Sequence, residues 1–119
     1  MNDRFATVGT KDDSNKVRLE LIAPEFLFGL GRVLTHGATK YSEWNWARGM
    51  FYTRVFGALL RHLFAWFRGE DIDPDSGEPH RDCAACCLMF LRQYTITHKE
   101  FDDRPNFEKM KVLATKESK

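Results

Sequence analysis

Six carboxylates gather in one short segment of the second half of the chain. They are Glu70, Asp71, Asp73, Asp75, Glu78 and Asp82, all within thirteen residues. Like charges at this density repel one another unless water screens them or a cation neutralises them. The segment is therefore either a solvated acidic loop or a binding site for a hard divalent cation, whose preferred ligands are carboxylate oxygens.

Two histidines flank this acidic segment. His62 interrupts an otherwise apolar stretch, where Ala58, Leu59 and Trp66 are its neighbours at helical spacing, and His80 follows the acidic residues. If antiparallel helices precede and follow the segment, both histidines and the carboxylates meet at one end of the helix pair. A lone histidine on an apolar face is more often a core residue, but two histidines beside one acidic segment favour a metal or catalytic site.

Two other kinds of metal site are compatible with parts of this spacing. Residues 71–82 place aspartates at positions 1, 3, 5 and 12 of a calcium-binding loop, although the glycine comes one position late and a proline stands at position 4. His80, Cys83 and Cys87 share one helix face, as zinc ligands would, but a single helix cannot close a tetrahedron. The small residues at 83–87 more simply allow close helix packing.

Basic, amide and aromatic side chains provide candidate contacts to a nucleotide. Lys40, Tyr41, Asn45 and Trp46 lie within seven residues, and this mixture suits a purine ring and phosphate oxygens, although Trp46 is equally suited to a core. Arg61 belongs to a stripe of three arginines spaced by seven residues. That stripe is either the solvent-exposed edge of an apolar helix or a row of cations that faces phosphates.

Three helices are expected to position these residues. Apolar residues recur at helical spacing over 24–41, 52–68 and 80–97, and Pro24 suits a first helical position. Glycine and proline indicate that the segments between these helices are loops. The predicted connections are a structured loop at 42–49 and the acidic loop at 70–79.

The fold class predicted from this pattern is all-α, a compact helical bundle of three to four helices. A single domain over residues 16–98 follows an N-terminal arm at 1–15 and precedes a charged tail at 99–119, in which at most a short helix comes after Pro105. Because apolar residues surround nearly the whole circumference of the helix at 52–68, we expect it to pack against another copy of the chain. The protein is therefore predicted to be a homo-oligomer.

The composition argues against several classes of protein. The 119 residues carry a formal net charge of +1, so a strong basic field for binding nucleic acid is absent. No apolar run reaches the roughly 18 residues that a membrane span requires, and the first residues lack a signal-peptide core, so we expect a cytoplasmic protein. Three cysteines within five positions favour reduced thiols over disulfides.

Three segments carry a resemblance to a known family, namely HGATKYSEWNW at 36–46, LLRHLFAW at 59–66 and GEDIDPDSGEPHRDCAACCLMFL at 69–91. The chain resembles phage dATP/dGTP diphosphohydrolases, MazG-like enzymes of the all-α NTP pyrophosphatase superfamily, and among them the MazZ group of phages that replace adenine with 2-aminoadenine. The resemblance implies an oligomeric all-α enzyme that needs Mg²⁺ or Mn²⁺ and releases pyrophosphate from a purine deoxynucleoside triphosphate. Similarity to the MazZ group also implies dGTP as substrate.

The chain departs from the general pattern of MazG-type enzymes at the metal ligands. Those enzymes carry EExxE and ExxD runs on two successive helices, and the predicted helices of this sequence carry neither. The resemblance therefore implies a rearranged ligand set, drawn from Glu70, Asp71 and Asp73 with His62, His80 or Asp82 as helpers.

The same resemblance implies roles for individual side chains. Glu70 or Asp73 would hold metal, a neighbouring carboxylate or His80 would accept a proton from water, and Arg61 with Lys40 would steady the phosphates. Two other functions remain open from the sequence. One is a nucleotide-binding or helical interaction module without catalysis, and the other is a zinc-stabilised structural protein.

Overall fold

Residues 8–111 are described by a computed structural model, in which three long helices carry the fold. They are α1 (Pro24–Lys40), α2 (Tyr52–Phe67) and α3 (His80–Thr97). Short 3-10 helices precede α1 (η2, Leu19–Leu21), lie between α1 and α2 (η3, Asn45–Arg48) and follow α3 (η4, Lys99–Phe101). The described residues contain no strand, so the predicted all-α class is confirmed and the three helices match their predicted bounds to within one residue.

The ends of the chain are described only in part. Residues 8–15 of the predicted arm are exposed, and residues 107–111 are helical, which agrees with the prediction of at most a short helix after Pro105. The rest of the predicted arm and of the predicted tail, 1–7 and 112–119, lies outside the described residues. None of the described helices has the length and apolarity that crossing a membrane demands.

The helix boundaries follow from local chemistry. Pro24 occupies the first turn of α1, where its missing N–H costs nothing. After α2, Gly69 adopts a φ of 100°, its N–H donates to the Trp66 carbonyl, and the Glu70 N–H donates to the Ala65 carbonyl. These two bonds form a Schellman motif, which requires the left-handed conformation that glycine adopts readily. The chain therefore leaves α2 sharply and enters the acidic loop.

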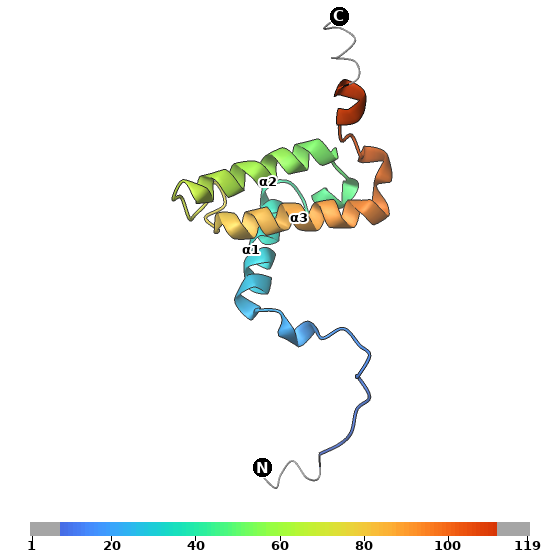
Figure 1. Cartoon of the computed structure of the whole chain (residues 1–119). Helices are drawn as coiled ribbons and strands as arrows, with labels where there is room; N and C mark the ends of the chain where they lie inside the picture. Colours follow the sequence, from blue (N-terminus) through green and yellow to red (C-terminus); the bar gives the residue numbers. More distant parts are fainter. Residues whose placement is uncertain (1–7, 112–119) are drawn as a thin grey trace, which may run out of the picture.

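The core lies between α2 and α3, which run antiparallel and side by side, while α1 crosses α3 (Figure 1). Tyr52, Val55 and Leu59 of α2 pack against Ala84, Cys87 and Tyr94 of α3. Tyr94 is fully buried, and its hydroxyl donates to the Trp46 carbonyl. The Tyr52 hydroxyl donates in turn to the Tyr94 carbonyl at 2.9 Å, so the buried hydroxyls tie the loop after α1 to the helix pair.

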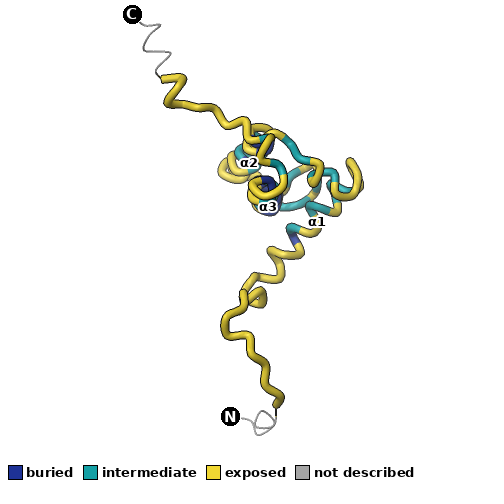
Figure 2. Tube along the Cα trace, turned by 90° about the vertical axis from the view of Figure 1, so that its right-hand side faces the viewer, coloured by how far each residue is buried: buried dark blue, intermediate teal, exposed yellow. Residues whose placement is uncertain are grey.

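Burial is confined to the contact between these helices (Figure 2). Helix α2 is buried on one side only within a single chain, and five of its large apolar side chains are exposed. Those five, which we call the α2 apolar face, are Phe56, Leu63, Phe64, Trp66 and Phe67. The N-terminal turns of α1 are also exposed, so one chain does not cover all of its apolar surface.

Two glycines of α1 offer a matched test of how closely this helix approaches α3. Gly29 is buried, and a Cβ there would collide with the Asp82 carboxylate, whereas a Cβ at Gly31 meets nothing within 4 Å. We expect Gly29→Ala to destabilise the fold by about 1–3 kcal/mol, because the Asp82 side chain must move. Gly31→Ala should stabilise it by about 0.5–1 kcal/mol through helix propensity.

The two variants are compared by urea unfolding followed by circular dichroism. Equal changes in the free energy of unfolding at the two positions would contradict the close contact between α1 and α3.

Candidate functional site

The acidic loop between α2 and α3 is folded around Asp73. The Asp73 carboxylate accepts hydrogen bonds from the Ser76 hydroxyl at 2.7 Å and from the backbone N–H groups of Ser76 and Asp75. The backbone of Asp73 donates to Glu78, and the His80 N–H donates to Asp71. Burial alone would raise the pKa of Asp73, but the hydrogen bonds from Ser76 and Asp75 outweigh it and lower the pKa. Asp73 is therefore a carboxylate at neutral pH.

The loop brings the two predicted histidines into direct contact. The Nδ1 atoms of His62 and His80 lie 2.9 Å apart, and His80 Nε2 lies 3.1 Å from Glu70 Oε1. If His80 Nε2 donates its hydrogen to Glu70, Nδ1 keeps a free lone pair directed at His62. Burial lowers the pKa of His62, so its imidazole is neutral at neutral pH.

His62, Asp73 and His80 each direct one ligand atom into the same small volume, and these atoms lie within 4.8 Å of one another. We call this group the His–Asp cluster. Two imidazole nitrogens bound to one ion at about 2.0–2.1 Å lie roughly 3 Å apart, which fits the distance between the two Nδ1 atoms. A neutral imidazole at His62 and an ionised carboxylate at Asp73 are also the protonation states that metal binding requires. The residues present therefore fit a divalent cation.

The structure brings together some of the residues predicted for this site and separates others. Glu70, Asp73, His62 and His80 are gathered, whereas Asp71 is exposed and takes no part in the His–Asp cluster. Asp82 is buried on α3 at the position that faces Gly29 of α1. The aspartates of the calcium-binding alternative therefore do not converge on one point.

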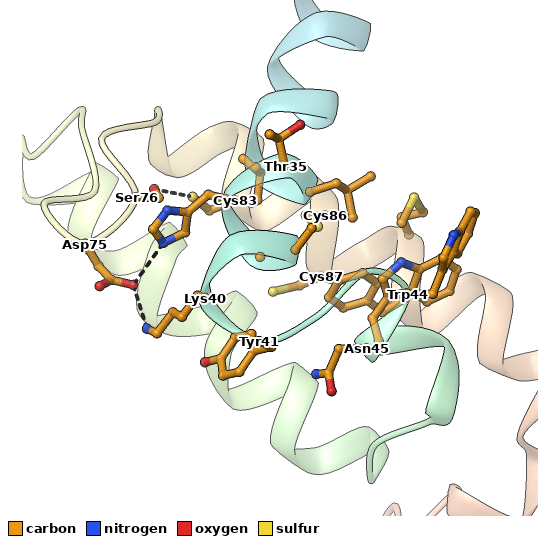
Figure 3. A pocket seen from close by; sticks show the side chains of 18 of the residues that line it. Thr35, Lys40, Tyr41, Trp44, Asn45, Asp75, Ser76, Cys83, Cys86 and Cys87 are labelled. Carbon is orange, nitrogen blue, oxygen red and sulfur yellow. Dashed lines mark hydrogen bonds and ion pairs between the residues drawn. The ribbon is translucent and has the colours of Figure 1, made fainter.

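A cavity of about 760 Å³ extends from the His–Asp cluster along the C-terminal half of α1 to the loop after it. Figure 3 shows Lys40 and Tyr41 at the end of α1, with Trp44 and Asn45 of the following loop around the same space. Of the predicted nucleotide contacts, Lys40, Tyr41, Asn45 and Trp46 line this cavity, and Arg61 does not. His62 and Asp73 line its other end.

Two tryptophans form the aromatic end of the cavity, and they differ in exposure. Trp46 is half-buried, stacks on Phe90 at 5.2 Å between ring centroids and belongs to the core. Trp44 is 71% exposed and has a φ of 62°, a conformation that costs free energy for a bulky residue. The Trp44 indole is tilted against Trp46, with 5.9 Å between the ring centroids, and is otherwise open to solvent, which makes Trp44 the better stacking surface for a ligand.

A cluster of three charged or titratable side chains, His36, Lys40 and Asp75, lies at the wall of the cavity that α1 forms. Lys40 Nζ is 2.9 Å from Asp75 Oδ2, and His36 Nε2 is 3.6 Å from the same oxygen. This contact lowers the pKa of Asp75 and raises that of Lys40. Sequence reasoning missed His36 and Trp44 as site residues, and it considered Asp75 only as a cation ligand and not as a partner of Lys40. The spacing of His36 and Lys40, four residues apart on one helix face, was the available signal for the first of them.

The three cysteines line the cavity between its two ends. Burial raises the pKa of Cys86 to about 12 and that of Cys87 to about 11. Burial also raises the pKa of Cys83, whose thiol lies 3.9 Å from Asp73 Oδ2 and 3.6 Å from the Ser76 hydroxyl. These thiols are free and protonated at neutral pH, so they act as a small apolar wall and not as nucleophiles.

Comparison with known proteins places this arrangement in a family. Residues 6–104 match the family described as "dATP/dGTP diphosphohydrolase, N-terminal", so the chain belongs to that family. It is 35% identical over 96 residues to a dATP/dGTP diphosphohydrolase of Salmonella phage PMBT28, a match that covers 81% of this chain. The chain spans only a third of the length of that relative (33%). No solved structure matches it.

Experiment can distinguish metal binding by the His–Asp cluster from metal binding by all the carboxylates of the acidic loop. Asp73→Asn should abolish high-affinity Mn²⁺ binding, because the amide is a neutral and weaker ligand, while its oxygen still accepts hydrogen bonds from Ser76. Asp71→Asn should leave the Mn²⁺ dissociation constant within about twofold, since that carboxylate lies outside the cluster. Isothermal titration with Mn²⁺ measures both constants.

The matched pair removes one negative charge from the same loop in each case. Equal weakening of Mn²⁺ binding in the two variants would indicate a diffuse acidic loop without a defined ligand set.

Proposed function

We propose that this chain is a metal-dependent pyrophosphohydrolase that converts a purine deoxynucleoside triphosphate to its monophosphate and pyrophosphate. The observation that carries the proposal is a single cavity with the His–Asp cluster at one end and exposed Trp44 at the other. Membership of the dATP/dGTP diphosphohydrolase family, and the name of the phage relative, support the same reaction.

A nucleotide fits this cavity in one orientation. The base stacks on Trp44 near Asn45, whose amide offers both a donor and an acceptor to a purine edge. The triphosphate then extends toward Lys40 and the His–Asp cluster. The reverse orientation would bring the phosphates against indole rings and protonated thiols, where nothing compensates their charge.

The His–Asp cluster holds the divalent cation in this proposal. A bound cation offsets negative charge on the triphosphate and lowers the pKa of a water molecule. Because two of the three ligands are imidazoles, the cluster favours Mn²⁺ over Mg²⁺. Glu70 fixes the orientation of His80 through their 3.1 Å contact, which is the usual part of a carboxylate beside a metal-binding histidine.

In the reaction, water attacks the α-phosphorus, the bond to the oxygen that bridges the α and β phosphates breaks, and pyrophosphate leaves. Glu70 does not itself line the cavity, but it contacts the His–Asp cluster through Oε1, and we assign its other carboxylate oxygen to accept the proton from water. Lys40 steadies the leaving pyrophosphate. Arg61, which lies outside the cavity, has no assigned part in one chain.

The finer assignment follows the resemblance. We propose that the chain is a MazG-like member of the all-α NTP pyrophosphatase superfamily, close to the MazZ group, and that dGTP is its preferred substrate. The dGMP product would then feed synthesis of 2-aminoadenine nucleotides in a phage. The His–Asp cluster takes the place of the EExxE and ExxD ligands that the three long helices lack.

The test is to incubate the protein with each common NTP and dNTP plus Mn²⁺ or Mg²⁺, and to measure the monophosphate by chromatography and pyrophosphate directly. We expect equimolar dGMP and pyrophosphate from dGTP, with lower rates for other nucleotides. Asp73→Asn should reduce turnover by at least about a hundredfold, because the cation no longer stabilises developing charge. Asp71→Asn is the matched control.

Two outcomes would contradict the proposal. Saturable nucleotide binding without hydrolysis would identify a nucleotide-binding module, and near-normal activity of Asp73→Asn would remove that residue from the site. Stoichiometric zinc whose removal unfolds the chain would favour a structural zinc protein instead.

We also propose that the protein is a homo-oligomer, a dimer or tetramer. The α2 apolar face consists of aromatic and leucine side chains between 40% and 78% exposed, and large exposed apolar surfaces of this kind usually mark an interface. A second copy is the simplest partner, because closed symmetric assembly buries the same face on both chains.

Light scattering should therefore give a mass of at least twice 13.9 kDa. Phe64→Glu, on the α2 apolar face, should shift the protein toward monomer, because association would bury an unpaired charge. Phe107→Glu makes the same change outside the three helices and should leave the mass unaltered. A monomeric mass for the unmodified protein would refute the proposal.

A further inference from the structure

His36 carries a polar atom that the folded chain does not satisfy. Its Nε2 atom is buried and has no hydrogen-bond partner. Among residues 8–111, no other buried side-chain nitrogen or oxygen is left without one. An unpaired buried polar group costs roughly 1–3 kcal/mol, so such an atom at a cavity wall indicates that a ligand completes its contacts. His36 lines the cavity described above.

The surroundings of His36 define the charge of that ligand. Lys40 lies one turn further along α1 and lines the same cavity. Both nitrogens face a single carboxylate oxygen of Asp75, at 3.6 Å from His36 Nε2 and 2.9 Å from Lys40 Nζ. Only the lysine is within hydrogen-bond distance, so Asp75 satisfies one of the two donors. Two converging donors that share one acceptor oxygen match an anion with several oxygens, such as a phosphate.

We infer that His36 and Lys40 form a subsite for the β and γ phosphates of the substrate, and that Asp75 occupies this subsite as a counter-ion until the substrate displaces it. The inference rests on the proposed function and adds to it a phosphate-binding residue and an internal competitor. Asp75 is 62% exposed at its side chain and lies on the loop, so it can leave toward solvent.

The position of the subsite is consistent with the direction of the reaction. His36 and Lys40 belong to α1, whereas the His–Asp cluster belongs to α2, α3 and their loop, and the cavity joins the two. The end of the triphosphate is thus held by one wall while the α-phosphate approaches the other. When pyrophosphate leaves, Asp75 restores the neutral pairing with Lys40.

A purely structural role for this group predicts a different response to substitution. If the contact only clamps α1 to the loop, removal of any of the three side chains weakens the cavity and all ligand binding alike. If Asp75 competes with phosphate, its removal strengthens anion binding, whereas removal of His36 weakens it. The sign of the change therefore separates the two cases.

The test is isothermal titration of inorganic pyrophosphate into the full chain, freed of divalent cations by a chelating resin. His36→Leu should weaken pyrophosphate binding by about ten- to a hundredfold, as expected for loss of a hydrogen bond to a charged group. His36→Gln keeps a donor at similar reach and should restore part of the affinity. Asp75→Asn should tighten binding by about two- to fivefold, through loss of the competing charge.

Arg54→Gln is the control, because it removes one positive charge from α2 at a residue that does not line the cavity. Circular dichroism verifies that each variant is folded. If His36→Leu does not fold, His36→Gln and Asp75→Asn still test the inference, because they should change the pyrophosphate affinity in opposite directions. Unchanged affinity in the folded His36 variants, weaker binding in Asp75→Asn, or no pyrophosphate binding to the unmodified chain would overturn the inference.

Hydrolysis of dGTP and dATP by the unmodified chain is measured in parallel with Mn²⁺. Pyrophosphate binding that depends on His36 in a chain without turnover would refute the proposed function and leave the phosphate subsite standing. Normal turnover with no dependence of pyrophosphate binding on His36 would do the reverse.

Discussion

The candidate site depends on the register of α2 against α3. His62 and His80 are 18 positions apart in sequence, yet their Nδ1 atoms meet at 2.9 Å because the chain reverses between them. The Schellman motif at Gly69 ends α2, and the turn around Asp73 directs the chain back into α3. One residue more or less in α2 would rotate His62 by about 100° around the helix axis, away from His80. Local turn chemistry thus sets the geometry of the His–Asp cluster.

The sequence was sufficient to predict the positions of the helices and the proximity of the two histidines. Helical periodicity located α1, α2 and α3 to within a residue at each end, and antiparallel neighbours necessarily bring the end of one helix to the start of the next. It was also sufficient to place Glu70 and Asp73 with these histidines, since both belong to the connecting loop. All of these relations are local or follow from a single reversal of the chain.

Sequence reasoning was less informative for residues whose position in the site depends on how α1 crosses α3. The acidic segment was treated as one group, but successive side chains of a tight turn point in different directions, so Asp71 stays in solvent while Asp75 reaches Lys40. The roles of His36 and Trp44 depend on where α1 and its following loop lie, and no periodic pattern encodes that contact. The backbone of Trp44, with its φ of 62°, lies in a turn that helical periodicity does not encode either.

The close approach of α1 to α3 brings the residues of α1 and its following loop to the same cavity as the His–Asp cluster. It needs small residues at the contact, which Gly29 supplies from α1 and the cysteine-rich start of α3 supplies from the other side. Because Cys86 and Cys87 have pKa values raised by burial to about 12 and about 11, this wall carries no charge at neutral pH. In the proposed function, phosphates that enter the cavity therefore meet cationic groups only near Lys40 and the metal-binding His–Asp cluster, whereas the Glu43 carboxylate lies at the Trp44 end. Under the proposed function, the same small side chains that permit the helix packing would also keep the wall between the two ends of the cavity free of charge.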